Sequence, residues 1–358
     1  MDVEIIKLNK MKKKIIIISV VCVLLLSAAL VWFFWPQKEK KLQIPKSELN
    51  EAKRNFKLQI LRYDQDLMKI NQNQLEEGIR QLADKYPSYL IDKNAYQNPQ
   101  LVEGLRKYLN DPILQDLFKQ SQKQFSSFEI YENEIIEGFA HYLVYFPNQK
   151  VPQIITMIPG LDLEMPSIYI FEDIVYINLD LYLGNNYAMY NKMGIPKYIS
   201  ERMDSKYITV DLFKKAMVYK HLPNQVPLTL LEAMIIEGKK LYFTEMMLPD
   251  KPLQDIIGYS EEKYSWAEKF YPNVWGYLIE NNLLYSKEDD AFRKYVEEAP
   301  FSKPFGNVSP GRIGQFLGWK IVKAYMENNP KITLSELMQT TDLQMILNKS
   351  AFKPIIKK

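Results

Sequence analysis

Apolar and polar positions repeat with two different periods along the chain, and the change of period predicts a mainly helical α+β fold. Residues 56–67 alternate apolar and polar, which predicts a strand that turns at Asp64. Apolar residues at helical spacing then predict helices, with the middle segment split at Asp111 before a proline. These helical segments are 73–86, 101–125 and 129–146.

The strand period returns after residue 151. Runs rich in β-branched and aromatic residues predict strands at 152–158, 167–171 and 174–181, and Glu172-Asp173 forms the turn between the last two. A small sheet is therefore expected in the middle of the chain. The spacing beyond it is again helical.

The stretch 211–243 predicts two half-buried helices joined by a turn at 221–227, which a proline closes at each end. The second helix presents Glu237 and Gly238 within an otherwise apolar run. A carboxylate on the buried side of a helix needs a partner, such as a metal, a base or backbone N–H groups.

This stretch resembles the metal-binding half of a zincin peptidase that has lost its ligands. In zincins one helix carries H-E-x-x-H, and a glutamate on the next helix supplies the third zinc ligand. With His221 as the second histidine, Met217 takes the first ligand position and Val218 that of the general base. Neither side chain can do that chemistry, so His221 and Glu237 fall one ligand short. On spacing alone, a surface histidine at a helix end and an unrelated glutamate explain the pair more simply.

The C-terminal third predicts further helices, at 260–270, at 274–284 and in a capped helix from Thr333. Ser309 is a good N-cap for another helix, and Pro310 is a good first-turn residue.

Within that helix Gly314 and Gly318 lie four residues apart, so another backbone can approach one face closely. Arg312 lies in the first turn, where the helix dipole disfavours a cation. We therefore expect an anionic partner for Arg312 and predict an ion pair with Glu237.

Composition places the chain among ordinary globular proteins and removes several classes of site. Of 358 residues, 47% are hydrophobic and 25% charged, and the net charge of +3 is too small for a nucleic-acid footprint. One Cys excludes an internal disulfide framework and a Cys-based zinc site, and two His exclude a three-His metal site. The second histidine, His141, is expected to pack within its apolar helix.

The N-terminal run 15–35 carries no charge and, at about 1.5 Å per residue, can cross a bilayer as a helix. The Lys-rich flank 1–14 is expected to stay in the cytoplasm. Residues 36–55 then form a polar stalk, and 56–358 form an exported domain.

A cleaved export signal is the alternative to a membrane anchor. Cys22 could carry a lipid, but it lies mid-run and follows Val21 instead of a small residue. We expect an uncleaved anchor in the inner membrane. A lipoprotein could instead reach the outer membrane.

Six separated segments resemble the gliding-motility lipoproteins of Bacteroidetes called GldB. They are LRYDQDL (61–67), YFPNQKVP (145–152), NLDLYLG (178–184), IEGK (236–239), WGYLIENNLLYS (275–286) and SPGRIG (309–314). The resemblance covers nearly all of the exported part. It implies kinship with predicted zinc-dependent peptidases through Glu237-Gly238, with the H-E-x-x-H lost at Met217 and Val218. It also implies a role in gliding motility beside other envelope proteins of the gliding machinery.

We therefore expect a membrane-tethered, non-catalytic protein with a degenerate zincin-like core, no cofactor and no nucleic-acid partner. The residues expected to bind or to hold the fold are Glu237, Gly238, Arg312, Gly314 and Gly318. Two alternatives stay open. One is a zinc metallopeptidase with atypical ligands, and the other is an envelope module that binds a peptide or glycan between strand 174–181 and the central helices.

Overall fold

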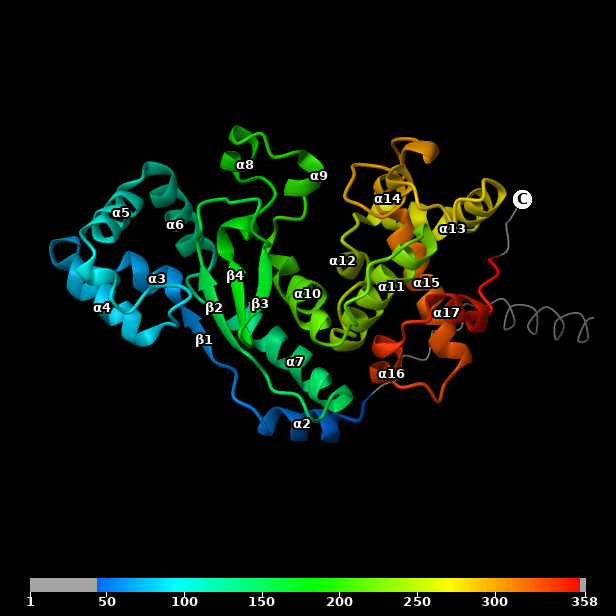
Figure 1. Ribbon diagram of the computed structural model, residues 1–358, viewed down its shortest axis with the longest axis horizontal. Helices are drawn as coiled ribbons and strands as arrows, with labels where there is room; N and C mark the ends of the chain where they lie inside the picture. The colour runs from blue at the N-terminus through cyan, green and yellow to red at the C-terminus, as the bar shows by residue number, and fades with distance from the viewer. Residues whose placement is uncertain (1–43, 355–358) are drawn as a thin grey trace, which may run out of the picture. The chain divides into compact units, whose positions relative to one another are not determined.

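The computed structural model describes residues 44–354, and it confirms a mainly helical α+β fold around one small sheet (Figure 1). The predicted flank 1–14, the apolar run 15–35 with Cys22, and residues 36–43 of the stalk lie outside the described residues. Within 44–354 no helix is both long enough and apolar enough to cross a bilayer.

The sheet contains four strands in the order β1-β2-β4-β3. Their bounds are β1 (Ile60–Arg62), β2 (Gln153–Met157), β3 (Ile168–Phe171) and β4 (Ile174–Asn178). The strands β1, β2 and β4 run parallel, and β3 runs antiparallel to β4, so β1 and β3 are the edges. Glu172 and Asp173 form the predicted turn with φ of 49° and 61°, as a two-residue hairpin of this twist requires.

Two strand predictions were wrong in extent. The strand predicted over 174–181 ends at Asn178 and continues as a 3-10 helix, η3 (Leu179–Tyr182), because the Asp180 carboxylate accepts N–H bonds from Gly160 and Leu161 at 2.8 and 2.7 Å. The strand predicted over 56–67 is reduced to β1. The following residues instead form a helix, in which Asp64 accepts a hydrogen bond from Thr156.

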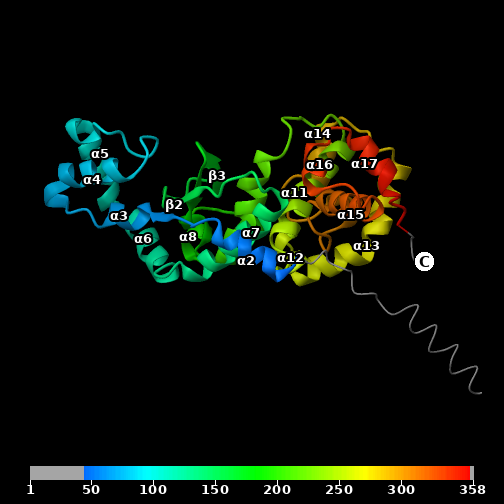
Figure 2. The ribbon, with the colours of Figure 1, turned by 90° about the horizontal axis from the view of Figure 1, so that it is seen from below.

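The two faces of the sheet belong to two apolar cores. Successive strand residues point to opposite faces, so Ile154 and Val175 join one core while Ile155 and Tyr176 join the other. The smaller core includes residues of α4 (Leu75–Lys85) and α5 (Pro99–Asn110). The larger one extends through α7 (Glu129–Tyr145) to α11 (Leu230–Met247) and α15 (Ile313–Asn328). Figure 2 shows α4 and α5 on the other side of the sheet from α11 and α15.

The helices before the sheet lie close to their predicted positions. Asn98 and Asp111 cap α5 and α6, each directly before a proline. Part of the predicted stalk is helix α2, which packs on α7 and pairs Lys53 with Glu137. The bounds are α2 (Lys46–Arg54), α3 (Tyr63–Met68), η1 (Gln72–Gln74), α4 (Leu75–Lys85), η2 (Ala95–Gln97), α5 (Pro99–Asn110), α6 (Pro112–Gln124) and α7 (Glu129–Tyr145).

The chain after the sheet is almost entirely helical. Its elements are α8 (Ala188–Lys192), α9 (Lys197–Ser200), η4 (Ser205–Tyr207), α10 (Ile208–Asp211), the π-helical turn η5 (Leu212–Ala216), η6 (Met217–Lys220), α11 (Leu230–Met247), α12 (Leu253–Ile257), α13 (Glu261–Glu280), α14 (Asp289–Tyr295), η7 (Lys303–Phe305), α15 (Ile313–Asn328), α16 (Leu334–Gln339) and α17 (Leu343–Ser350).

Two helix boundaries differ from the sequence predictions. The helices expected at 260–270 and 274–284 are one helix, α13, which continues through Pro272. The helix expected to begin at Ser309 begins at Ile313. Its predicted cap is used elsewhere, because the Ser309 hydroxyl donates to the Gly306 carbonyl at 2.6 Å and accepts from the Ser302 N–H at 3.1 Å.

Candidate functional site

The central stretch forms two helical segments joined by a turn, as predicted, but the first segment is not a regular α-helix. It passes from α10 into the π-helical turn η5 and then into the 3-10 helix η6, which ends at Lys220. Such π-helical turns are rare in proteins, and those that occur are often found at functional sites. The second segment, α11, begins after Thr229, whose side chain accepts the N–H of Glu232.

Met217 and Val218 are fully buried in the larger core, and His221 follows the helical segment instead of lying on it. The His221 ring stacks on Phe146 with centroids 3.9 Å apart, and its Nε2 lies 2.9 Å from the Tyr142 hydroxyl. Burial lowers the pKa of His221 to about 4, so the ring is neutral at pH 7. The expectation of a surface histidine was therefore wrong, because an aromatic cluster encloses it.

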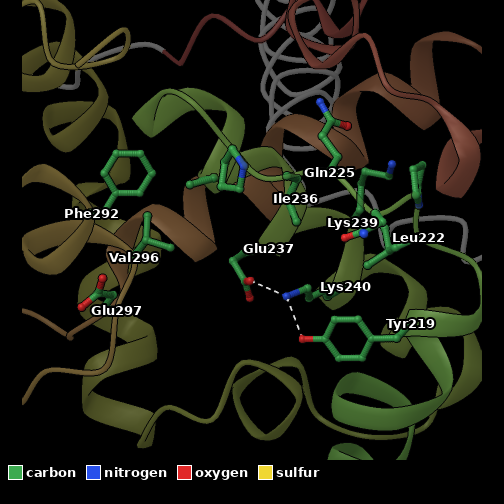
Figure 3. A pocket seen from close by; sticks show the side chains of 14 residues that line it. Tyr219, Leu222, Gln225, Ile236, Glu237, Lys239, Lys240, Phe292, Val296 and Glu297 are labelled. Carbon is green, nitrogen blue, oxygen red and sulfur yellow. Dashed lines mark hydrogen bonds and ion pairs between the residues drawn. The ribbon is translucent and has the colours of Figure 1, made fainter. Parts of the chain in front are cut away.

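Glu237 does not face the core. Its side chain is about a quarter exposed and pairs with Lys240 one turn later, at 2.6 Å. Lys240 also donates to the Tyr219 hydroxyl at 3.1 Å, as Figure 3 shows. Burial alone would lower the pKa of Lys240, but Glu237 outweighs it and the pKa is raised. The Lys240 ammonium thus stays charged at pH 7.

The Glu237–Lys240 pair lies in a groove of about 400 Å³. Side chains from the turn, from α11 and from the α14 region line it, and Figure 3 shows the Glu237, Lys240 and Tyr219 side chains meeting at its wall. The lining residues are Tyr219, Leu222, Pro223, Asn224, Gln225, Pro227, Ala233, Ile236, Glu237, Lys239, Lys240, Phe292, Val296 and Glu297.

Gly238 lies at the contact between α11 and α15. A Cβ on Gly238 would lie 2.2 Å from the carbonyl carbon of Gly318, and a Cβ on Gly318 would lie 1.6 Å from the Met234 oxygen. Gly314 makes a third close approach, to the Tyr295 oxygen at 2.8 Å. This is the backbone contact that the spacing of Gly314 and Gly318 predicts.

The predicted ion pair between Glu237 and Arg312 was wrong. The Arg312 Nε instead lies 3.0 Å from Glu298, and its terminal nitrogens donate to the carbonyls of Ile257 and Gly258 at 3.1 and 3.2 Å. Arg312 is also the N-cap residue of α15, and not a residue of its first turn as was predicted. The helices α11 and α15 are joined by the glycine contact and by Glu245 of α11, which accepts from the Trp319 ring N–H at 2.7 Å and pairs with Lys323 at 3.7 Å.

His141 packs within α7 as predicted, with its Nδ1 2.9 Å from the Glu137 carbonyl oxygen. Sequence reasoning missed Lys239, which is 1% exposed. Its ammonium donates to the carbonyls of Met338 and Thr340 at 2.8 and 2.9 Å, at the C-terminus of α16. Burial lowers the pKa of Lys239 to about 8. Its position beside Glu237-Gly238 gave no sign of this role.

The zinc site that the zincin resemblance implies does not fit these residues. Met217 and Val218 offer neither a ligand nor a base, and the His221 Nε2 is engaged by Tyr142. Across residues 44–354 no group of three or more His, Cys, Asp or Glu side chains could hold a metal ion.

The sequence profile of the family described as gliding motility protein GldB matches residues 45–354. No curated protein and no solved structure matches the chain.

Proposed function

Because the chain belongs to the GldB family of gliding motility proteins, we propose that it is a non-catalytic, envelope-anchored part of a gliding machinery that binds a partner protein in the groove of Figure 3. Involvement in gliding motility follows from the family itself. Attachment to the envelope is supported by the lipoprotein label that the family carries.

The observation that carries the binding role is the apolar rim of the groove. Tyr219, which lines it, is 52% exposed, and Val226 and Leu228, on either side of Pro227, are 76% and 64% exposed. Exposed apolar side chains beside a groove that holds an ion pair are typical of interaction surfaces. A partner segment would cover the apolar rim and hydrogen-bond to the exposed part of Glu237.

A degenerate zincin-like core is supported by the order of elements, with a small sheet, then a helical segment against its edge, then α11. The antiparallel edge strand β3 packs against η5, and Lys215 on η5 donates to Ser167 beside β3 at 2.9 Å. The two histidines of a zincin are four residues apart on one helix. Asp211 and Lys215 have this spacing and form an ion pair at 2.8 Å. We propose that these two residues, instead of Met217 and His221, occupy the lost ligand positions.

The alternative of a binding cleft beside strand 174–181 would need a different strand, since β4 lies inside the sheet and β3 forms the edge. An Asp–Lys pair also supports a non-catalytic role. A cation in place of a histidine repels zinc, and the pair leaves no free base to activate water.

Partner binding in the groove is tested by the gliding of cells in which this protein carries a single substitution. Val226→Asp places a charge on the apolar rim of the groove without touching the core. We expect it to abolish gliding at an unchanged protein level and melting temperature. The matched control is Ile130→Asp, a 73% exposed position on α7, which should leave gliding intact. Normal gliding of Val226→Asp would contradict the groove.

The absence of catalysis is tested by the metal content of the full-length protein. We expect no stoichiometric zinc, before or after dialysis against zinc. One zinc per chain that is lost in both His221→Ala and Glu237→Gln would support a metallopeptidase instead. Zinc retained in both variants but lost in Asp211→Asn would move the metal to the Asp211–Lys215 position and would likewise overturn a non-catalytic role.

A further inference from the structure

Two cavities away from the groove adjoin at Arg202 and Glu298, which line both. One has a volume of about 270 Å³ and an apolar wall. That wall is made by Leu163, Met165, Pro166, Leu181, Ile199 and Met203. The other has a volume of about 290 Å³, includes Arg312 and Lys263, and is lined mainly by polar and aromatic side chains. An apolar cavity with a few convergent polar groups is the usual form of a small-molecule site.

Two buried guanidinium groups meet where the cavities adjoin. The Arg202 and Arg312 side chains are only 12% and 6% exposed, and both donate to the same carbonyl oxygen, that of Ile257, at 3.3 and 3.1 Å. Two like charges held this close in a buried place repel each other. The Lys214 amine lies next to them, since it donates to the Ile256 carbonyl at 2.9 Å, and burial together with Arg202 lowers its pKa well below the usual value.

Two carboxylates, those of Asp211 and Glu298, pair with the guanidinium groups of this cluster. Asp211 pairs with Arg202 at 3.4 Å but also with Lys215 at 2.8 Å, so that carboxylate is already neutralised. Glu298 pairs with Arg312 at 3.0 Å, yet its side chain is 47% exposed. The polar cavity is further lined by Glu201, Asp204, Lys206 and Lys263, and Lys206 pairs with Asp255 outside it.

Two helix N-termini also lie at the polar cavity. Ser260, the N-cap of the 20-residue helix α13, and Arg312, the N-cap of α15, both line the polar cavity. Arg312 also has φ of 56°, a left-handed conformation that is uncommon for a residue other than glycine. Strain of this kind is concentrated at functional sites.

We propose that the two cavities together bind one small amphiphilic anion. Its carboxylate or phosphate head lies on Arg202 and Arg312, and its short apolar body lies against Leu163, Met165 and Ile199. In this structure the Glu298 carboxylate occupies the position beside Arg312 where the head group would bind. Glu298 therefore competes with the ligand. The site is separate from the groove of Figure 3, and its failure would leave the groove intact.

The experiment is a calorimetric titration of the full-length protein in a non-ionic detergent, with the titration into detergent alone subtracted. The probes are hexanoate and hexyl phosphate, with acetate for the head alone and hexanol for the body alone. We expect saturable binding of at least one six-carbon anion, at least about tenfold tighter than acetate or hexanol. The tighter of the two anions identifies the head group.

Three variants then separate the site from general surface binding. Glu298→Gln removes the competing carboxylate and should tighten binding several-fold, whereas Glu297→Gln, a neighbour that lines only the other groove, should not. Leu163→Glu puts a charge on a half-exposed wall position and should weaken binding at least about tenfold, the equivalent of about 1.4 kcal/mol. Equal affinity for acetate and hexanoate, or equal effects of Glu298→Gln and Glu297→Gln, would overturn the proposal.

Discussion

His221 is a histidine whose neutral ring completes an aromatic cluster. It contacts Phe146, Tyr142 and Phe243, and its carbonyl accepts a hydrogen bond from the Gln339 side chain at 2.8 Å. The sequence shows a polar residue at the start of a proline-closed turn, and such residues are usually exposed. The partners that bury His221 come from α7 and α11 and from the end of α16. Spacing along one helix therefore could not reveal its surroundings.

The pKa of His221 makes stability depend on pH. The unfolded histidine takes up its proton near pH 6.5, while the folded one does so only near pH 4. Between these values the unfolded state binds more protons, so stability falls as the pH is lowered through this window. The contribution of His221 to this loss is up to about 3 kcal/mol.

Urea unfolding at pH 7, 5.5 and 4.5 measures that loss. The matched variant is His221→Gln, which keeps a polar group for Tyr142 but does not titrate. Carboxylates titrate equally in both proteins, so the difference between them isolates His221. If the two proteins lose stability in parallel from pH 7 to 4.5, His221 is not neutral in the folded state.

At the scale of elements, the contact between α11 and α15 depends on two glycines. Gly318→Ala would push a methyl group into the Met234 carbonyl oxygen, and α15 backbone atoms would have to move. We expect it to lower the free energy of unfolding by about 3 kcal/mol or more. Gly104→Ala, on exposed α5 with open space around it, should instead add about 0.5–1 kcal/mol. A small loss of unfolding free energy for Gly318→Ala would mean that α11 and α15 can move apart at little cost in free energy.

The elements themselves were largely predictable, and the reasons are local. Proline and Asp or Asn caps mark the starts of α5 and α6. β-branched runs mark β2, β3 and β4. The start of α15 was missed because Ser309 is a good cap by type but bonds within the 302–309 loop. Two partners of Arg312 were missed because Ile257 and Gly258 offer main-chain carbonyls, which leave no mark in side-chain chemistry.

The candidate sites were less predictable than the elements, since both depend on residues distant in the sequence. The groove joins residues 219–240 to 292–297, and the adjoining cavities join residues 163–215 to 258–263 and 298–312. The sequence pointed to Glu237 through its place in an apolar run, but α11 carries it on the groove side. Arg202 and Asp211 gave no signal, because each charge is ordinary until the fold encloses it.

At the scale of the whole molecule, the fate of the N-terminal residues distinguishes an inner-membrane anchor from a lipoprotein that could reach the outer membrane. We expect the mature protein to keep residues 1–35, since Val21 is a poor residue before a lipidated Cys22. Intact mass spectrometry of protein purified from membranes measures this directly. A mature chain that begins with acylated Cys22 would instead agree with the family's lipoprotein label.

The proposed N-terminal tether would give the order of α2 and β1 a mechanical meaning. Tension applied at residue 44 would reach α2 first and then β1, an edge strand of three residues, before any interior strand. Those segments could peel away and lengthen the tether by up to about 60 Å, at about 3.3 Å per residue. Peeling would stop at Arg62 and Asp64, because Arg62 donates to the Phe125 carbonyl and Asp64 accepts from the Thr156 hydroxyl. The domain would thus yield in length under load while β2, β3 and β4 keep their pairing.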